Sequence, residues 1–357
     1  MKDFWNKYKK NKLAVFGLGW IVLCILISVF AYIIAPDNSA NGNDIQLLIA
    51  LQKPGFKVDG VLLKKEKPIA QNLFAILLNG KEQEFEFKPM KKYQLNENNK
   101  KLEYAEYTTT DDTTHIYHTV AFDKLYNITE PIKTNYYILG TDRFGRDLLS
   151  RLLIGARVSL SVGFIAVSIS LLLGLVLGLL AGYYRGSTDY IISWLINVIW
   201  SLPTLLIVVS ITLALGKGFW QVFVAVGLTM WVEVARVVRG QVFSIREKEY
   251  IEAARTIGAS NTRIIFKHIL PNVTGPLVVI CAANFATAIL LEAGLSFLGL
   301  GVQPPEPSWG MMIKEHYNYV VMDHAYLAMV PGLAIMFLVM AFNYVGMGLR
   351  DVWDVKG

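Results

Sequence analysis

Histidine and cysteine are the side chains of this protein that could bind a transition metal or act as strong nucleophiles. His115 and His118 are three apart in a segment whose residue pattern predicts a β-strand. Such residues point to opposite faces of a strand, so the two could not share one ion without a bulge. Cys24 and Cys281 each lie in an apolar run, so neither a disulfide framework nor a cysteine zinc site is expected. We predict no metal site.

Sequence motifs for catalysis are absent as well. The sequence has no GxxxxGK[ST] loop for nucleotide phosphates, no Gly-x-Ser-x-Gly elbow and no His-Glu-x-x-His pair. We therefore predict no catalytic residue, no cofactor bound by this chain and no enzymatic activity. Basic residues are not gathered on one soluble face, which argues against nucleic-acid binding.

The most distinctive segment runs from Arg246 to Val273 and predicts a helical hairpin. Its first half carries an apolar stripe at helical spacing, made by Tyr250, Ile251, Ala253, Ala254 and Ile257. Gly258 can adopt the left-handed conformation that ends a helix, and Ser260 can cap a second short helix. Pro271 suits the first turn of the helix that follows. This hairpin either packs on the protein's own underside or docks into a groove on a partner.

The elements around this hairpin are predicted to be membrane spans. The 357 residues are 54% hydrophobic and 17% charged, whereas soluble domains are about 45–50% apolar and about 25% charged. A transmembrane helix needs about 20 apolar residues. Pro203 predicts a kink in the third of these spans. The six segments that qualify are 13–35, 158–182, 190–215, 219–238, 273–293 and 325–349.

Lysine and arginine residues predict the orientation of the spans. Five lysines precede the first span, and seven basic residues lie between Arg236 and Lys267. Residues 36–157 carry 17 basic and 16 acidic residues and are nearly neutral. By the positive-inside rule, both termini and the loop 239–272 face the cytoplasm, and the long segment after the first span lies outside. The formal net charge of +6 thus mostly reflects the basic residues that set the orientation of the spans in the membrane.

Residues 36–135 are expected to form a small β-rich extracytoplasmic insert, whose role the sequence leaves open. Strand-like alternation occurs at 85–88, 104–109 and 113–122, with Asp111-Asp112 as a hairpin turn. The expected organisation is an N-terminus and first helix in 1–35, the insert in 36–135, a membrane core in 136–350 that contains the hairpin, and a tail in 351–357.

Several residues within or beside the spans are candidates for packing or contact. Gly174, Gly178 and Gly182 share one face of the second span, which favours close helix packing within the subunit over contact with a second membrane subunit. Glu233 and Arg236 are spaced to pair. Glu292 lies at the outer end of the fifth span, where it could hold the following loop or contact a partner. That loop contains the candidates Gly299 and Trp309, and we expect it to fold over the outer mouth.

The hairpin resembles a known motif. Glu252-Ala253-Ala254, then Gly258, then Leu270-Pro271 match the EAA loop of ABC importer permeases. The string from His268 to Asn272 is that of the peptide-importer branch. Residues 139–161 and 292–310 also resemble the C-type subunits of dipeptide and oligopeptide permeases, whereas the insert is not covered.

The resemblance implies an all-α polytopic protein with six transmembrane helices of the type I ABC importer fold, in the inner membrane of a bacterium. It implies import of dipeptides or oligopeptides with a second homologous permease, two ATPases and an extracytoplasmic binding protein. ATP and Mg would bind the partner ATPases. The residues implied in coupling to them are Glu252, Ala253, Ala254, Gly258, Leu270 and Pro271.

Two alternatives remain open. A nickel or nickel-chelate permease would look very similar, although the predicted spans contain no histidine, which favours peptide. A membrane sensor could use 36–135 as an input domain. It would need a cytoplasmic output module, and the tail after Arg350 has only seven residues.

Overall fold

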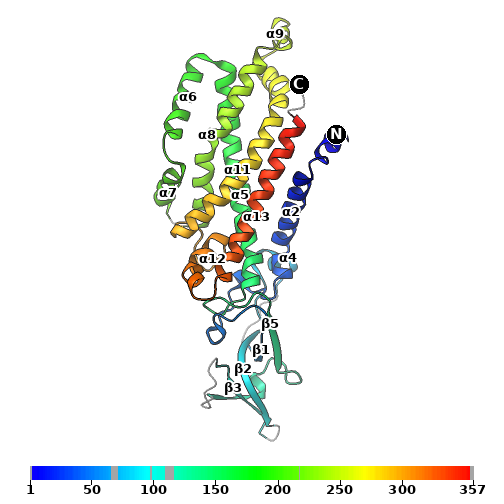
Figure 1. Cartoon of the computed structure of the whole chain (residues 1–357), viewed down its shortest axis with the longest axis vertical. Helices are drawn as coiled ribbons and strands as arrows, with labels where there is room; N and C mark the ends of the chain where they lie inside the picture. The colour runs from blue at the N-terminus through cyan, green and yellow to red at the C-terminus, as the bar shows by residue number, and fades with distance from the viewer. Residues whose placement is uncertain (1, 66–70, 97–98, 109–115, 217, 354–357) are drawn as a thin grey trace.

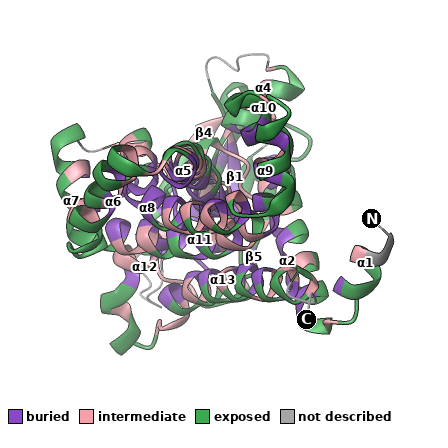
Figure 2. Ribbon diagram, turned by 90° about the horizontal axis from the view of Figure 1, so that it is seen from above, coloured by how far each residue is buried: buried purple, intermediate pink, exposed green. Residues whose placement is uncertain are grey.

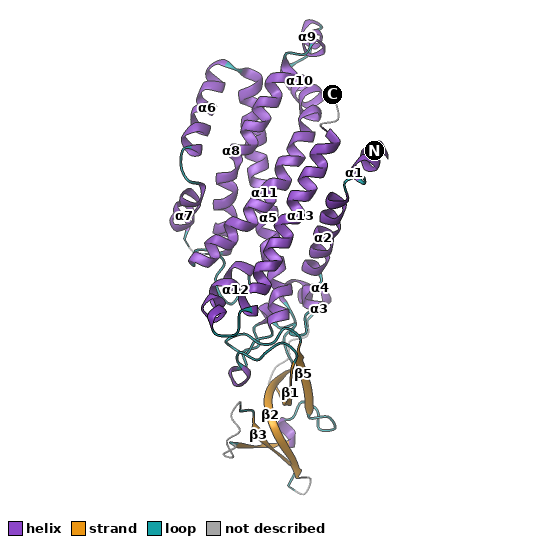
Figure 3. Ribbon diagram, viewed as in Figure 1, coloured by secondary structure: helices purple, strands orange, loops and turns teal. Residues whose placement is uncertain are grey.

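The computed structural model describes residues 2–65, 71–96, 99–108, 116–216 and 218–353. Helices form a long bundle, and a small β-sheet projects from one end of it (Figure 1, Figure 3). Helix α1, the end of α13 and helix α9 lie at the opposite end (Figure 1). The bundle thus separates the sheet from the hairpin region, as the sequence predicts for an insert and a loop on two sides of a membrane.

The helices of the bundle overlap the predicted spans, although α5 begins before residue 158 and the segment 13–35 is divided between α2 and α3. Within the described residues, five helices are long and apolar enough to cross a membrane, or six if α6 and α7 form one bent span. Buried residues are concentrated where α5, α8 and α11 meet (Figure 2). The helices are α1 (Lys2–Tyr8), α2 (Lys12–Val29), α3 (Ala31–Ile34), α4 (Leu73–Asn79), α5 (Leu148–Tyr184), α6 (Gly186–Trp200), α7 (Thr204–Leu215), α8 (Phe219–Arg246), α9 (Glu249–Thr256), α10 (Asn261–Ile264), α11 (Leu270–Leu298), α12 (Trp309–His316) and α13 (Tyr326–Trp353).

The predicted third span is broken rather than kinked. Helices α6 and α7 meet at 93° across the short break between Trp200 and Thr204. Pro203 precedes the first residue of α7 with an extended ψ of 121°. Proline lacks the N–H for a helical hydrogen bond and disfavours helical geometry in Leu202 before it, so the helix ends here.

The fifth span also differs from its prediction, because it is continuous with the second helix of the hairpin. A single helix runs from Asn261 to Leu298. A π-helical segment, Ile265–Ile269, lies between α10 and α11, and the Leu270 N–H donates to the Ile265 carbonyl. Pro271 cannot donate a hydrogen bond to the preceding turn. The wide turn directly before it accommodates this missing donor without ending the helix.

Helices α5 and α8 approach closely along the glycine face of α5. A Cβ atom at Gly178 would lie 2.7 Å from the Ala235 carbonyl oxygen. Gly174 and Gly182 face α8 in the same way, with the nearest Cβ atoms of α8 at 2.5 and 2.6 Å from their would-be Cβ positions. No larger side chain fits these contacts without moving the helices apart. The glycine face therefore packs against a helix of the same chain.

The sheet is antiparallel, with strand order β4-β3-β2-β1-β5. Apolar residues pack on both of its faces, around Phe87 on one and Met90 on the other. The predicted strands at 85–88, 104–109 and 113–122 overlap β2, β3 and β4, whereas β1 was not predicted and β5 ends two residues beyond 135. The strands are β1 (Phe56–Lys64), β2 (Phe85–Asn96), β3 (Lys101–Glu106), β4 (Tyr117–Ala121) and β5 (Ile132–Tyr137).

One part of the predicted insert falls outside the described residues, namely His115 and the Asp111-Asp112 turn. His118 lies on β4, where its Nε2 is 3.7 Å from a Glu106 carboxylate oxygen. The ring also stacks on Tyr104 of the neighbouring strand. His118 therefore packs against its neighbours on the surface of the sheet.

Alanine substitutions should reveal how much the bundle depends on the α5–α8 contact. Gly178→Ala places a methyl group against the Ala235 carbonyl, so we expect a lower thermal unfolding midpoint of the detergent-solubilised protein. Gly240→Ala on α8 is the matched control, because a Cβ there would meet no atom within 4 Å. The control should be neutral or stabilising, since alanine favours helix over glycine by up to about 1 kcal/mol. Equal midpoints for the two variants would contradict the close-packing role.

Candidate functional site

The hairpin formed by α9 and α10 is fixed to the bundle by one apolar face. Ile251 and Ala254 of α9 are buried and belong to the same apolar cluster as Val242 and Ile245 of α8. Ile264, Ile265 and Ile269 complete the cluster from the second arm. Of the predicted stripe, only Ile251 and Ala254 are buried, whereas Tyr250, Ala253 and Ile257 are exposed, so the stripe is divided between two faces of α9. One face of the hairpin is thus packed on the protein's own end.

Gly258 forms the turn of the hairpin. The Ala259 N–H donates to the Ala254 carbonyl at 3.0 Å, and the Gly258 N–H donates to the Arg255 carbonyl at 2.9 Å. This pair of bonds is a Schellman motif, which requires a left-handed residue, and Gly258 has a φ of +80°. A Cβ at Gly258 would meet no atom within 4 Å. Glycine is therefore favoured here by the left-handed backbone conformation and not by a lack of space for a side chain. Ser260 then caps α10 by accepting from the Arg263 N–H.

The other surface of the hairpin is exposed and partly apolar. Of the coupling candidates, Glu252, Ala253, Gly258 and Pro271 are exposed, Leu270 is half-buried and Ala254 is buried. Tyr250, Phe266 and Ile257 add large exposed apolar groups, and Ile257 is 85% exposed. Large exposed apolar side chains on a short hairpin are candidates for contact with a partner. The candidates therefore divide into those that hold the hairpin and those that can contact a partner.

The hairpin is also tied to the end of α5 by polar contacts. The Tyr183 hydroxyl donates to the Asn261 side-chain oxygen at 2.7 Å. The guanidinium groups of Arg246 and Arg255 lie 5.7 and 5.4 Å from the centre of the Tyr183 ring. Tyr183 of α5 thus contacts α8 through Arg246 and the hairpin through Arg255 and Asn261.

The outer-loop candidates lie at the other end of the bundle. Glu292 is 0% exposed, and its Oε1 accepts a hydrogen bond from the Ser296 hydroxyl at 2.7 Å. Trp309 is buried and donates from Nε1 to the Leu152 carbonyl of α5 at 2.9 Å. Gly299 ends α11 in the left-handed conformation, with a φ of +81°. Trp309 therefore holds the end of this loop on α5, whereas the hydrogen bond of Glu292 lies within α11 and its side chain does not reach the surface.

A cluster of buried charges beneath this loop was not found by sequence reasoning. The Arg146 Nε donates to Asp142 Oδ2 at 2.6 Å, and its Nη2 donates to Glu315 Oε2 at 2.9 Å. Arg151 lies 3.7 Å from the same Glu315 oxygen and 3.9 Å from Asp142. All four side chains are at most 6% exposed. The cluster joins the start of α5 to α12.

Asp142, Glu315 and His316 could by position share a metal ion, since their ligand atoms lie within 4.8 Å of one another. Both carboxylates, however, already pair with arginines, so the two acids and the two bases balance. Burial lowers the pKa of His316, which favours the neutral form of its ring. The chemistry of this donor set fits a structural ionic cluster better than a metal site.

Only one pair in this cluster has a spacing that sequence reasoning could have recognised. Asp142 and Arg146 have the four-residue spacing of a local pair, but Glu315 lies 169 residues from Arg146.

The predicted pairing of Glu233 with Arg236 is wrong for the described structure. Among the described ion pairs none joins these two, and the Arg236 guanidinium instead lies 3.3 Å from the centre of the Trp200 ring.

Comparison with protein families gives two matches. Residues 174–355 match the family model described as binding-protein-dependent transport system inner membrane component. Residues 1–54 match the N-terminal TM domain of oligopeptide transport permease C. The two ranges flank residues 55–173, which contain the sheet.

Curated relatives agree with these matches. The dipeptide transport system permease protein DppC of Alkalihalophilus pseudofirmus is 42% identical over 61% of this chain and 71% of its own. The glutathione transport system permease protein GsiD of Pectobacterium atrosepticum is 42% identical over 61% and 72%. The oligopeptide transport system permease protein OppC of Bacillus subtilis is 38% identical over 65% and 75%.

The buried charge cluster is expected to stabilise the folded protein. Glu315→Gln leaves two buried guanidinium groups facing one carboxylate, which costs roughly 3–5 kcal/mol in buried ion pairs. We expect a clearly lower unfolding midpoint in detergent. Asp323→Asn is the control, since it removes one partner of the exposed pair with Lys53 and should leave the midpoint unchanged. A Glu315→Gln protein as stable as the control would refute the structural role of the cluster.

Proposed function

Because the chain belongs to the family of binding-protein-dependent transport system inner membrane components, we propose that it is the permease subunit of an ATP-driven importer of dipeptides or oligopeptides. The family consists of multi-pass inner-membrane transport components rather than enzymes. Members work with a binding protein and an ATPase. Beyond membership of this family, we propose a substrate class, a coupling surface and a composition for the complex.

The observation that carries the proposal is the exposed, partly apolar face of the hairpin. Its buried face packs on α8, and Tyr183 at the end of α5 contacts it. A short helix held in this way, with small and apolar groups outward, is suited to a groove on a partner protein. The chain has no phosphate-binding loop of its own. We infer that the partner is the ATPase, which binds ATP and Mg.

In the proposed topology α6 and α7 together form one span, so that six spans cross the membrane. Both termini and the hairpin then face the cytoplasm, which agrees with the basic residues concentrated there. The sheet is extracytoplasmic. The full complex would contain a second homologous permease, two ATPases and an extracytoplasmic binding protein. Closure of the ATPase pair would displace the hairpins and, through α5 and α8, rock the two permeases.

Peptide is proposed as the substrate because the relatives include dipeptide, oligopeptide and glutathione permeases. A nickel permease gains no support from the Asp142, Glu315 and His316 group, since arginines already neutralise its carboxylates.

Enlarging an exposed residue of the hairpin tests the coupling surface. Ala253→Leu adds bulk to the outward face of α9 while leaving the buried contacts of Ile251 and Ala254 unchanged. We expect membrane insertion at wild-type level and at least tenfold less ATPase recovered with the tagged chain in mild detergent. Ala283→Leu makes the same change at an exposed position within α11 and should recover the ATPase normally. Normal recovery with Ala253→Leu would contradict ATPase docking on this face.

A pair of substitutions at Gly258 separates conformation from contact. Asparagine tolerates the left-handed region whereas valine does not. If the turn is what matters, Gly258→Asn should retain ATPase stimulation and Gly258→Val should lose it. Loss in both variants would show instead that the surface at Gly258 must be bare. Stimulation retained with valine would remove the turn from the coupling mechanism.

A further inference from the structure

A pocket of about 390 Å³ lies where the sheet joins the helical bundle. Its walls come from the loop after α3, from β2 and β5, and from Asp147, the residue that caps α5. Most of its lining residues lie in 55–173, between the ranges that the two family models match, and the others lie in the loop at 36–44, inside the N-terminal match. The proposed function assigns no role to this pocket.

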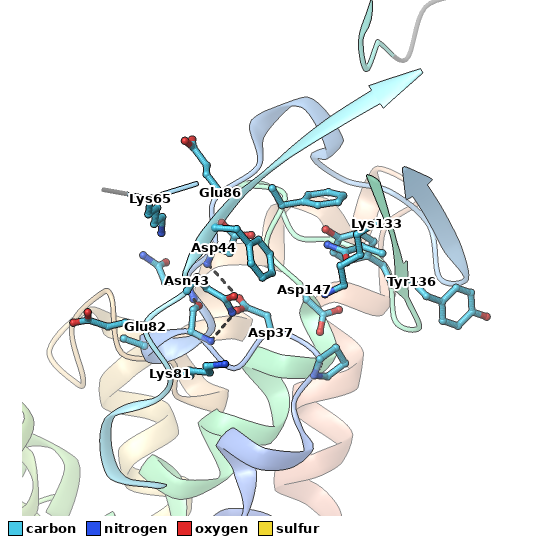
Figure 4. Close-up of a pocket in the computed structure, with 18 residues that line it drawn as sticks. Asp37, Asn43, Asp44, Lys65, Lys81, Glu82, Glu86, Lys133, Tyr136 and Asp147 are labelled. Carbon is cyan, nitrogen blue, oxygen red and sulfur yellow. Dashed lines mark hydrogen bonds between the residues drawn. The ribbon is translucent and has the colours of Figure 1, made fainter. Parts of the chain in front are cut away.

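Three carboxylates, Asp37, Asp44 and Asp147, lie together in this pocket (Figure 4). The two oxygens of Asp37 accept from the backbone N–H groups of Ser39 and Asp44. Asp147 is only 4% exposed; its Oδ2 accepts from the Ser150 N–H, but its Oδ1 has no hydrogen-bond partner. None of the three carboxylates has an ion pair among the described residues. Five acidic and three lysine side chains line the pocket, so it carries an excess of negative charge.

Electrostatics indicate that these carboxylates would gain from a bound cation. Burial raises the pKa of Asp44, and the charge of Asp37 raises it further. Burial also raises the pKa of Asp147, with Asp37 again contributing. The ionised forms are thus penalised by missing solvent and by mutual repulsion. A positive group placed among them would relieve both penalties.

Lysines and aromatic rings surround the acidic residues. Lys65 and Lys81 lie on one side of the pocket in Figure 4, and Lys133 lies on the other. The Lys133 ammonium is 5.4 Å from the centre of the Phe85 ring, and Phe87 also lines the pocket. Glu82 and Glu86 lie on the side of Lys65 and Lys81, and Lys81 is 3.9 Å from a Glu84 carboxylate oxygen. The pocket therefore offers carboxylates in its middle, lysine ammonium groups at its sides and apolar surface between them.

The size of the pocket indicates an organic ligand rather than a bare ion. Sites for small molecules are typically about 300–1,000 Å³. The three aspartates are also not among the described groups whose ligand atoms lie close enough to share one metal ion. A ligand that matches the charge pattern carries an ammonium group and a carboxylate a few bonds apart, with apolar substituents between them.

We propose that this pocket binds a short peptide through its free amino terminus. The α-ammonium lies among Asp37, Asp44 and Asp147, and the peptide carboxylate faces the lysines. This assignment rests on the proposed function for its substrate class and adds to it a peptide site on the permease itself, outside the membrane bundle. The site would hold a peptide beside the start of α5.

Binding of a defined peptide to the purified full chain in detergent tests the assignment. Equilibrium dialysis with labelled trialanine should detect saturable binding. N-acetyl-trialanine, which lacks the ammonium group, should bind at least tenfold more weakly. Asp44→Asn and Asp37→Asn should each weaken trialanine binding at least tenfold. Glu103→Gln, an exposed carboxylate of β3 outside the pocket, is the matched control and should bind like the wild type.

Three results would each overturn the assignment. The first is equal binding of free and acetylated trialanine, the second is wild-type affinity in both aspartate variants, and the third is the absence of saturable binding. If Ca²⁺ binds in an Asp44-dependent way while trialanine does not, the pocket is a cation site and the peptide assignment is wrong. Melting curves of the variants separate misfolding from loss of the site.

Failure of this proposal can be told apart from failure of the proposed function. Peptide binding is measured on the chain without its partners, and ATPase recovery is measured separately on the same preparation. A chain that recovers the ATPase but does not bind trialanine retains the coupling role and loses the pocket assignment. A chain that binds trialanine but recovers no ATPase shows the opposite.

Discussion

The close contact between α5 and α8 is the constraint on which the rest of this structure depends. Three glycines on α5 bring it against the backbone of α8, and a Cβ at any of them would overlap atoms of that helix. Helix α5 has 37 residues, which corresponds to about 55 Å. It begins at the buried charges near the sheet and ends at the Tyr183 contact with the hairpin. One helix pair thus connects the two ends of the protein.

The buried charges fix the outer end of this pair. Two arginines and two acids have been removed from water together, which costs desolvation energy and is tolerated because the charges balance and the hydrogen bonds are short. Arg146, which bridges the two acids, directly precedes Asp147 in the chain. Asp147 caps α5 and also lines the pocket beneath the sheet. The start of α5 is therefore shared by a structural cluster and by the proposed peptide site.

The sequence predicts the features that arise from local signals and misses those that arise from distant contacts. Apolar length locates the spans, and Gly258 with Ser260 locates the hairpin turn, because each signal lies within a few residues. Strand β1 shows no alternation because Val58, Val61 and Leu62 are buried on both faces of the sheet. The Arg146–Glu315 bond spans 169 residues, and Pro203 predicts an interruption of the third span without predicting the 93° angle between α6 and α7.

The π-helical segment Ile265–Ile269 has a consequence for how the hairpin and the membrane helix are related. A wide turn accommodates one residue more than an α-helical turn, which rotates everything beyond it by about 100° around the axis. Even so, Ile264, Ile265 and Ile269 before the end of this turn and Val273 and Leu277 after it belong to one buried cluster with α8 and α9. The wide turn thus lies within an apolar face that continues from the hairpin into the membrane helix. The hairpin and the start of α11 are therefore packed as one unit.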